Sequence, residues 1–219
     1  MELATAVDRL EEIVDRVERE PMPVPVREVW AFGDITLGLD PIQRLDVYVT
    51  KDVIMDGDTD AAAEFEAEYG IKGVGTTVDA AWARANPDRV RTSDNGYAAP
   101  EKCLAAELVD GVDASGDEPI HLEVCNASFD DNVTQRFKGA LAREAYEDAL
   151  DPRGVCLWVD GQRDDEALTK LRDAAFPMPT LSDAFGMLGA DESAAEAAAA
   201  ALETRRADQE GPSVRGDMV

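Results

Sequence analysis

Residues 26–52, VREVWAFGDITLGLDPIQRLDVYVTKD, give the clearest indication of how this chain folds. The apolar run Val26–Phe32 predicts a strand, and Gly33 opens a short turn-rich segment after it. The nearly alternating apolar residues of Leu45–Thr50 predict a second strand, which carries Asp46. The stretch therefore predicts two strands joined by a glycine turn, with an acidic side chain close to that turn.

The flanking segments extend this pattern to an α/β (α+β) fold. Residues 3–19 have apolar residues at helical spacing and predict an amphipathic helix before the first strand, and residues 58–69 predict another helix. Residues 119–125, PIHLEVC, predict a third strand, which we expect beside the first two in one mixed sheet flanked by helices. We expect an α/β domain over residues 1–160, a C-terminal helical region over 161–207 and a disordered tail over 208–219.

Taken in order, these features resemble the signature of the small nucleotidyltransferases, the minimal and polymerase-beta-like members of that fold. The family has a helix, a strand, a Gly-Ser turn, a second glycine, Asp-x-Asp on the next strand and a further acid on the third. In this chain Gly33 and Gly38 match the glycines, Asp46 matches the second acid of the pair, and Glu123 matches the acid on the third strand. The resemblance covers roughly residues 1–127 and implies a nucleotidyltransferase-like sheet.

The resemblance also implies a reaction that depends on metal ions. Clustered carboxylates hold two divalent cations that bridge a triphosphate, activate the attacking oxygen and stabilise the leaving pyrophosphate. In an active member of the family, Asp46 and Glu123 would be the catalytic and metal-binding residues, Mg²⁺ or Mn²⁺ would be the cofactor, and Asp34 or Asp40 would be a further ligand.

Two replacements separate this chain from the family pattern. Arg44 stands where the first acid belongs, and Asp34 replaces the serine of Gly-Ser. Side chains two apart on a strand point to the same face about 7 Å apart, so the Arg44 guanidinium is placed to substitute for a metal ion and to pair with Asp46 or Glu123. Asp34 adds negative charge where a phosphate would approach. We therefore expect Gly33, Asp34 and Arg44 to form a nucleotide-phosphate or pseudo-metal position.

An ordinary structural explanation of the same residues stays open. Asp46 and Glu123 are equally compatible with charged side chains on the open face of a sheet, paired with Arg44. Gly33 and Gly38 are equally compatible with common turn geometry.

Acidic residues outnumber basic residues by 47 to 21, which gives a formal net charge of -26. One interpretation is a surface that binds cations or basic partners, and the other is adaptation to high intracellular salt, which screens the repulsion between carboxylates. The acids are dispersed along the chain and lysine is scarce, which favours the second interpretation. The whole chain also resembles an uncharacterised haloarchaeal protein family, so we predict a cytoplasmic protein of a halophilic archaeon.

Several classes of protein are disfavoured. No basic and apolar leader opens the sequence, and no run approaches the roughly 18 apolar residues of a membrane span. Cys103, Cys125 and Cys156 are far apart and His121 is the only histidine, which argues against a structural zinc site. Arginine and lysine are too dispersed to predict a strong nucleic-acid patch.

Three functions are compatible with these patterns. We favour a catalytically degenerate nucleotidyltransferase-like protein that acts as a binding or regulatory module for a nucleotide or a protein. The first alternative is an active metal-dependent nucleotidyltransferase that uses Asp46 and Glu123. The second alternative is a structural or interaction protein that works through its C-terminal helices. The relative positions of Asp34, Arg44, Asp46 and Glu123 should discriminate among them.

Overall fold

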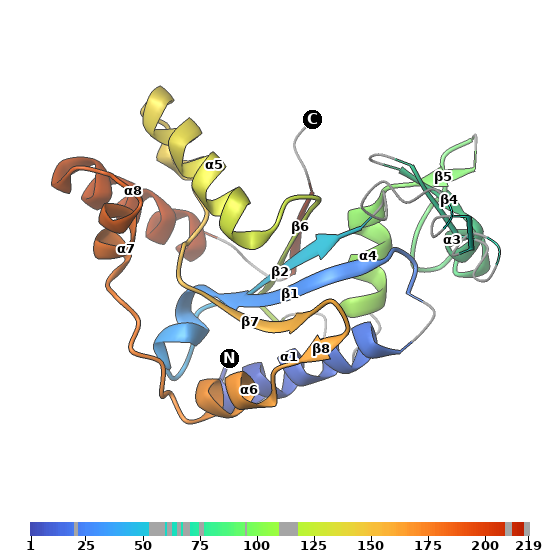
Figure 1. Cartoon of the computed structure of the whole chain (residues 1–219), viewed down its shortest axis with the longest axis horizontal. Helices are drawn as coiled ribbons and strands as arrows, with labels where there is room; N and C mark the ends of the chain where they lie inside the picture. Colours follow the sequence, from blue (N-terminus) through green and yellow to red (C-terminus); the bar gives the residue numbers. More distant parts are fainter. Residues whose placement is uncertain are drawn as a thin grey trace.

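A mixed sheet runs through the centre of the protein (Figure 1). The structure is a computed structural model and describes residues 1–19, 22–52, 60, 63–64, 67, 71–74, 77–94, 96–109, 118–208 and 212–216. Within these residues the strands of the sheet are β1 (Val26–Phe32), β2 (Leu45–Lys51), β6 (Ile120–Cys125), β7 (Gly154–Val159), β8 (Gln162–Arg163) and β9 (Ser213–Gly216).

The strand order is β8-β7-β1-β2-β6-β9. The central strand β1 is antiparallel to both β2 and β7, whereas β6 is parallel to β2 and to β9. The three strands expected to be neighbours, β1, β2 and β6, are therefore adjacent in one sheet, and this prediction is confirmed.

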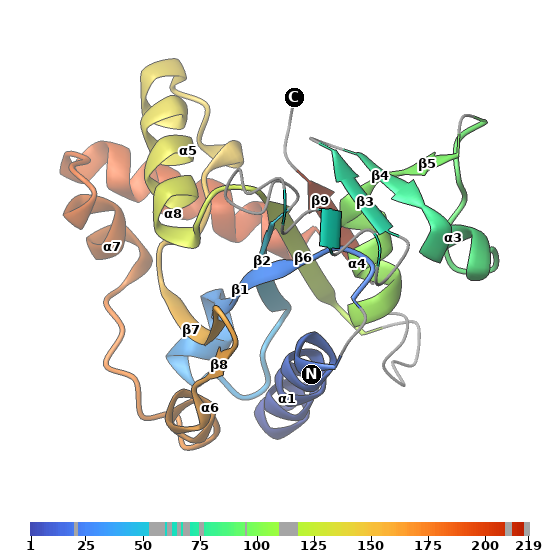
Figure 2. The ribbon, with the colours of Figure 1, turned by 45° about the vertical axis from the view of Figure 1, so that its right-hand side comes forward.

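Three helices cover one face of the sheet: α1 (Leu3–Glu18), α4 (Pro100–Leu108) and α6 (Asp165–Arg172). The apolar stripe of α1 is buried against sheet residues such as Val47, Leu122 and Leu157, each fully buried, which confirms the expected amphipathic helix. Helix α6 contributes Leu168 to this same core, so the first helix beyond residue 160 packs with the preceding domain. Figure 2 shows α1 and α6 together on this side of the sheet.

The opposite side carries α5 (Phe129–Arg143), α7 (Leu181–Met187) and α8 (Glu192–Ala207), with the short 3-10 helix η3 (Tyr146–Asp148) after α5 (Figure 2). Phe129 anchors α5 on the sheet, because its ring stacks on Trp30 at 4.9 Å and meets Tyr48 edge-on at 5.3 Å between ring centroids. Phe137 of α5 stacks on Phe185 of α7 at 4.7 Å. Helices α7 and α8 thus form a smaller core with α5 rather than with the main core.

A second, three-stranded sheet lies beside α4 in Figure 1 and has the order β3-β4-β5. Its elements are β3 (Ile71–Val74), β4 (Thr77–Ala80), the short helix α3 (Ala81–Ala85) and β5 (Tyr97–Ala98). The helix expected over residues 58–69 falls largely outside the described residues. In the part of the chain that the structure describes, every helix is too short or too polar to cross a membrane.

The expectation of a disordered tail over residues 208–219 is wrong for Ser213–Gly216, which form β9. Ser213–Gly216 pairs in parallel with β6, and the Ser213 hydroxyl lies 2.7 Å from Nδ1 of His121. A sheet edge presents unpaired backbone N–H and C=O groups that a polar segment can satisfy. Backbone pairing with β6 therefore brings this polar segment into the sheet.

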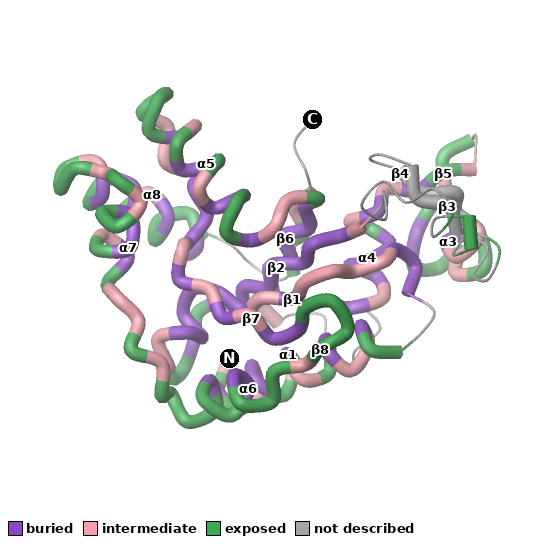
Figure 3. Tube along the Cα trace, in the orientation of Figure 1, coloured by how far each residue is buried: buried purple, intermediate pink, exposed green. Residues whose placement is uncertain are grey.

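Negative charge is concentrated at the protein surface. Figure 3 shows buried backbone along the sheet and exposed residues on the outer sides of the helices. Among the residues whose burial the structure describes, only Asp34, Asp46, Glu123 and Asp151 are buried acids. The other acids in this set face solvent fully or partly, where their repulsion responds to ionic strength.

We therefore expect the melting temperature to rise substantially from about 0.1 M to molar KCl, because salt screens repulsion within a chain of net charge -26. Thermal unfolding followed by circular dichroism measures this dependence. An uncharged osmolyte at matched osmolality is the control, since it does not screen charge. Equal melting temperatures at both KCl concentrations would refute the halophilic interpretation.

Candidate functional site

The candidate site lies at the end of the sheet where strand β1 finishes and strands β2 and β6 start. Because β1 and β2 are antiparallel, Phe32 at the end of β1 pairs with Asp46 at the start of β2. Because β2 and β6 are parallel, Asp46 in turn pairs with His121. The short 3-10 helix η1 (Gly33–Leu37) follows β1 and brings the glycine turn to the same end.

Gly33 occupies a position that other residues would strain. Its φ of +76° lies in the left-handed region, and a Cβ there would lie 2.4 Å from Nη2 of Arg206 and 2.8 Å from Oδ2 of Asp46. The Thr36 hydroxyl donates to the Gly33 carbonyl at 2.7 Å and holds the turn closed. The predicted glycine turn is therefore present, and it packs closely against the guanidinium of Arg206 in the C-terminal helix α8.

Arg206, in the last turn of α8, is the centre of the site. Its guanidinium lies 2.7 Å from Oδ2 of Asp151, 3.5 Å from Oδ1 of Asp34 and 3.6 Å from Oδ2 of Asp46. The side chain is buried, which by itself lowers the pKa of Arg206, but the charges of the three aspartates raise that pKa overall. Three carboxylates thus share one permanent positive charge.

Asp46 is fully buried and contacts two guanidiniums. It forms an ion pair with Arg44, as the two-residue spacing predicts, and a second with Arg206. Neither of its carboxylate oxygens accepts a well-aligned hydrogen bond from the residues that the structure describes. Burial therefore outweighs the charges of Arg206 and Arg44 and raises the pKa of Asp46.

Asp151 is also buried, but its hydrogen bonds are well aligned. Arg153 binds it with two parallel hydrogen bonds, from Nε to Oδ1 at 2.9 Å and from Nη2 to Oδ2 at 2.7 Å. Burial raises the pKa of Asp151, but the hydrogen bonds from Arg153 and the charge of Arg206 lower it overall. Asp151 is therefore held as a carboxylate at neutral pH.

Glu123 has its own set of cationic partners. Arg136 of α5 donates from Nη1 to Oε1 at 2.5 Å, Nε of Arg215 in β9 lies 3.7 Å from the same oxygen, and Nε2 of His121 lies 3.0 Å from Oε2. Burial raises the pKa of Glu123, but the hydrogen bond with His121 and the charge of Arg136 lower it overall. The two acids predicted to share metal ions thus bind different arginines.

Asp40, considered as a further ligand, is placed elsewhere. Its Oδ1 accepts a hydrogen bond from the backbone N–H of Leu3 at 3.1 Å, at the start of α1. This contact satisfies one of the open N–H groups of that helix.

These residues do not fit Mg²⁺ or Mn²⁺. A divalent cation requires carboxylate oxygens that face an open position, whereas Asp34, Asp46 and Asp151 face the Arg206 guanidinium. Among the residues that the structure describes, no group of three or more His, Cys, Asp or Glu side chains is placed to hold a metal ion.

The sequence patterns missed four residues of the site: Asp151, Arg206, Arg136 and Arg215. Asp151 looks like part of a turn, Asp-Pro-Arg-Gly, and Arg206 looks like a basic residue that complements the dipole of α8. The sequence contains one signal that could have identified Asp151 as a site residue. Residues 151 and 153 form an Asp-x-Arg pair, which is the reverse of the Arg-x-Asp pair of residues 44 and 46.

Comparison with known proteins identifies a family without assigning an activity. No curated protein and no solved structure matches the chain. The model of a family of unknown function, DUF7095, matches residues 2–219. Since this match covers nearly the whole chain, the protein belongs to the DUF7095 family.

Proposed function

We propose that this protein is a catalytically degenerate nucleotidyltransferase-like protein that acts as a binding or regulatory module. The order of helix α1, strand β1, glycine turn, strand β2 and later strand β6 supports the proposal, since it follows the element order of the family that the motif resembles. Gly33 and Asp46 lie at the same end of this sheet, and Glu123 lies two residues along β6 from His121, the register partner of Asp46.

The main observation that supports a degenerate site is the set of ion pairs around the acids. Arg206 contacts Asp34, Asp46 and Asp151, and Arg44 contacts Asp46 as well. A cation entering here would meet the repulsion of two guanidiniums. Displacing Arg206 would also leave buried carboxylates without their counter-charge, which is strongly unfavourable. The acids are therefore used to hold α8 against the sheet, and not to bind metal ions for transfer chemistry.

The two alternatives have less support. An active transferase needs a reachable Asp46, whereas this side chain is fully buried between Arg44 and Arg206. Partner binding through the C-terminal helices needs an unpartnered apolar face, whereas Ala198 and Leu202 of α8 are already buried in the core shared with α5 and α7.

We also propose that the protein works in the cytoplasm of a halophilic archaeon. The net charge of -26, the dispersal of the acids and the scarcity of lysine support this assignment.

Replacing Arg44 by aspartate should increase the affinity for Mn²⁺ by about tenfold or more, because it removes one of the two guanidiniums beside Asp46 and adds a second carboxylate on the same strand face. The wild type should show no tight Mn²⁺ binding, since guanidiniums surround Asp46. Calorimetric titration in molar KCl measures both affinities. The matched control is Arg27→Asp, which makes the same charge change at the other end of β1, where Arg27 pairs with Asp160.

The same titration can contradict the proposal. If the wild type binds Mn²⁺ tightly and Asp46→Ala abolishes that binding, the metal site is intact and the protein is not degenerate.

A further inference from the structure

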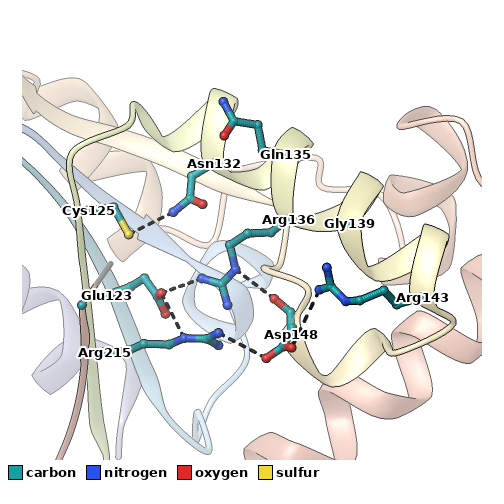
Figure 4. Close-up of a pocket in the computed structure, with 10 residues that line it drawn as sticks. Glu123, Cys125, Asn132, Gln135, Arg136, Gly139, Arg143, Asp148 and Arg215 are labelled. Carbon is teal, nitrogen blue, oxygen red and sulfur yellow. Dashed lines mark hydrogen bonds and ion pairs between the residues drawn. The ribbon is translucent and has the colours of Figure 1, made fainter. Parts of the chain in front are cut away.

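A cleft of about 300 Å³ lies between α5 and β9, with β6 as its floor (Figure 4). Glu123 projects from the floor, Arg136 and Arg143 come from α5, Arg215 comes from β9, and Asp148 comes from the end of η3. Arg136, Gly139 and Arg143 are spaced by three and four residues, which places them on one face of α5. Guanidiniums therefore enter the cleft from two opposite walls.

Two of these arginines are held in place by protein groups. Arg136 binds Glu123 and also donates from Nε to the Asp148 carbonyl at 2.9 Å. Arg215 donates from Nη2 to Oδ1 of Asp148 at 3.2 Å and lies near Glu123. Both side chains are mostly buried, so their orientation is determined before any ligand arrives.

Arg143 is held much less firmly. Within the part of the chain that the structure describes, its one ion pair is a 4.0 Å contact with Asp148, and 60% of its side chain is exposed. The neighbouring Gly139 has no side chain, and a Cβ there would lie 3.2 Å from Nη1 of Arg143. Glycine inside a helix is less favourable than alanine, and here it leaves room for the Arg143 guanidinium at the cleft wall.

The cleft has an excess of positive charge within a strongly acidic protein. Its lining contains three arginines and two acids, whereas the whole chain has a net charge of -26. Arg205 lies nearby and donates to the Glu147 carbonyl, and its pKa is lowered by burial and by the positive charges of Arg215 and Arg136. A cleft that concentrates cations in this way attracts anions.

We propose that this arginine cleft binds the phosphate group of a small molecule. This inference rests on the binding role proposed above and specifies the ligand for that role. A guanidinium presents paired N–H donors that match the oxygens of a phosphate. Donors from two opposite walls suit a tetrahedral anion, whereas a planar carboxylate needs only one guanidinium fork. The volume of 300 Å³ holds a phosphate and part of an attached group.

The test compares wild type, Arg143→Gln and the control Arg172→Gln by calorimetric titration with orthophosphate, pyrophosphate and ATP. Arg172 is a partly exposed surface arginine that pairs with Asp8 and Glu11 on α1, far from the cleft in sequence and fold. The titrations contain molar KCl and a chelator. A metal-dependent nucleotide complex at Asp46, which would contradict the degenerate function, therefore gives no signal in this experiment.

We expect wild type and Arg172→Gln to bind at least one of these probes, and Arg143→Gln to bind it roughly tenfold more weakly, because a charged hydrogen-bond donor is lost. Similar affinities for orthophosphate and ATP would assign recognition to the phosphate alone, and tighter ATP binding would add contacts with the nucleoside. Because Arg143 is exposed, its variant should keep the wild-type melting temperature. Absence of binding by the wild type, or equal affinity in Arg143→Gln, would overturn the proposal.

Discussion

Replacing Arg206 by alanine should lower the free energy of unfolding by about 3–5 kcal/mol, the range found when one partner of a buried ion pair is removed. The variant leaves Asp34, Asp46 and Asp151 at the sheet edge without the charge they share. Asp151 keeps Arg153 and Asp46 keeps Arg44, so we expect a destabilised but folded protein. Urea unfolding at constant molar KCl measures the change, since urea does not alter the ionic strength.

The neighbouring residue provides the control for Arg206→Ala. Arg205→Ala removes the same charge from the same helix turn, but Arg205 is only partly covered, and its hydrogen bond is to the Glu147 carbonyl and not to a buried acid. Surface substitutions usually change stability by less than about 0.5 kcal/mol. Similar small losses in both variants would show that the three aspartates do not depend on Arg206.

Replacing Gly33 by alanine should cost about 2–5 kcal/mol, because backbone strain and overpacking add. The φ of +76° disfavours any side chain, and the new methyl group would lie 2.4 Å from the Arg206 guanidinium. That guanidinium cannot move away without weakening its hydrogen bond to Asp151.

Gly161→Ala separates the two contributions at Gly33. Gly161 has a similar φ of +82°, but apart from its chain neighbours no atom of the described residues lies within 4 Å of the position of its Cβ, so its variant reports backbone strain alone. We expect the Gly33 variant to lose more stability than the Gly161 variant in the same urea titration. Equal losses would mean that Arg206 adapts freely and does not depend on the glycine.

The parts of this fold that follow from local pattern were predictable from the sequence. The period-two alternation identified β2 and the helical spacing identified α1, because each signal lies within one element. The Arg44–Asp46 ion pair was predictable for the same reason, since neighbouring residues of one strand face project together.

The partners that come from distant elements were not predictable. Glu123 was identified as a site acid, but Arg136 and Arg215 reach it from α5 and β9, and their approach depends on how those elements pack. Arg206 satisfies the helix dipole and the acid cluster at once, and only the first of these roles has a local signal. Tertiary packing thus decided which chemistry the predicted acids can perform.

The contacts of the site join residues that are far apart along the chain. The Thr36 hydroxyl and the Arg153 carbonyl are separated by 117 residues, His121 and Ser213 by 92, and Asp151 and Arg206 by 55. Loops of this length close slowly and at an entropic cost, so such contacts are late to form in a folding chain. Until α8 docks, Asp46 has a counter-charge only two residues away, in Arg44. Arg44 is thus the local counter-charge of Asp46, whereas Arg206 can reach Asp46 only when α8 packs against the sheet.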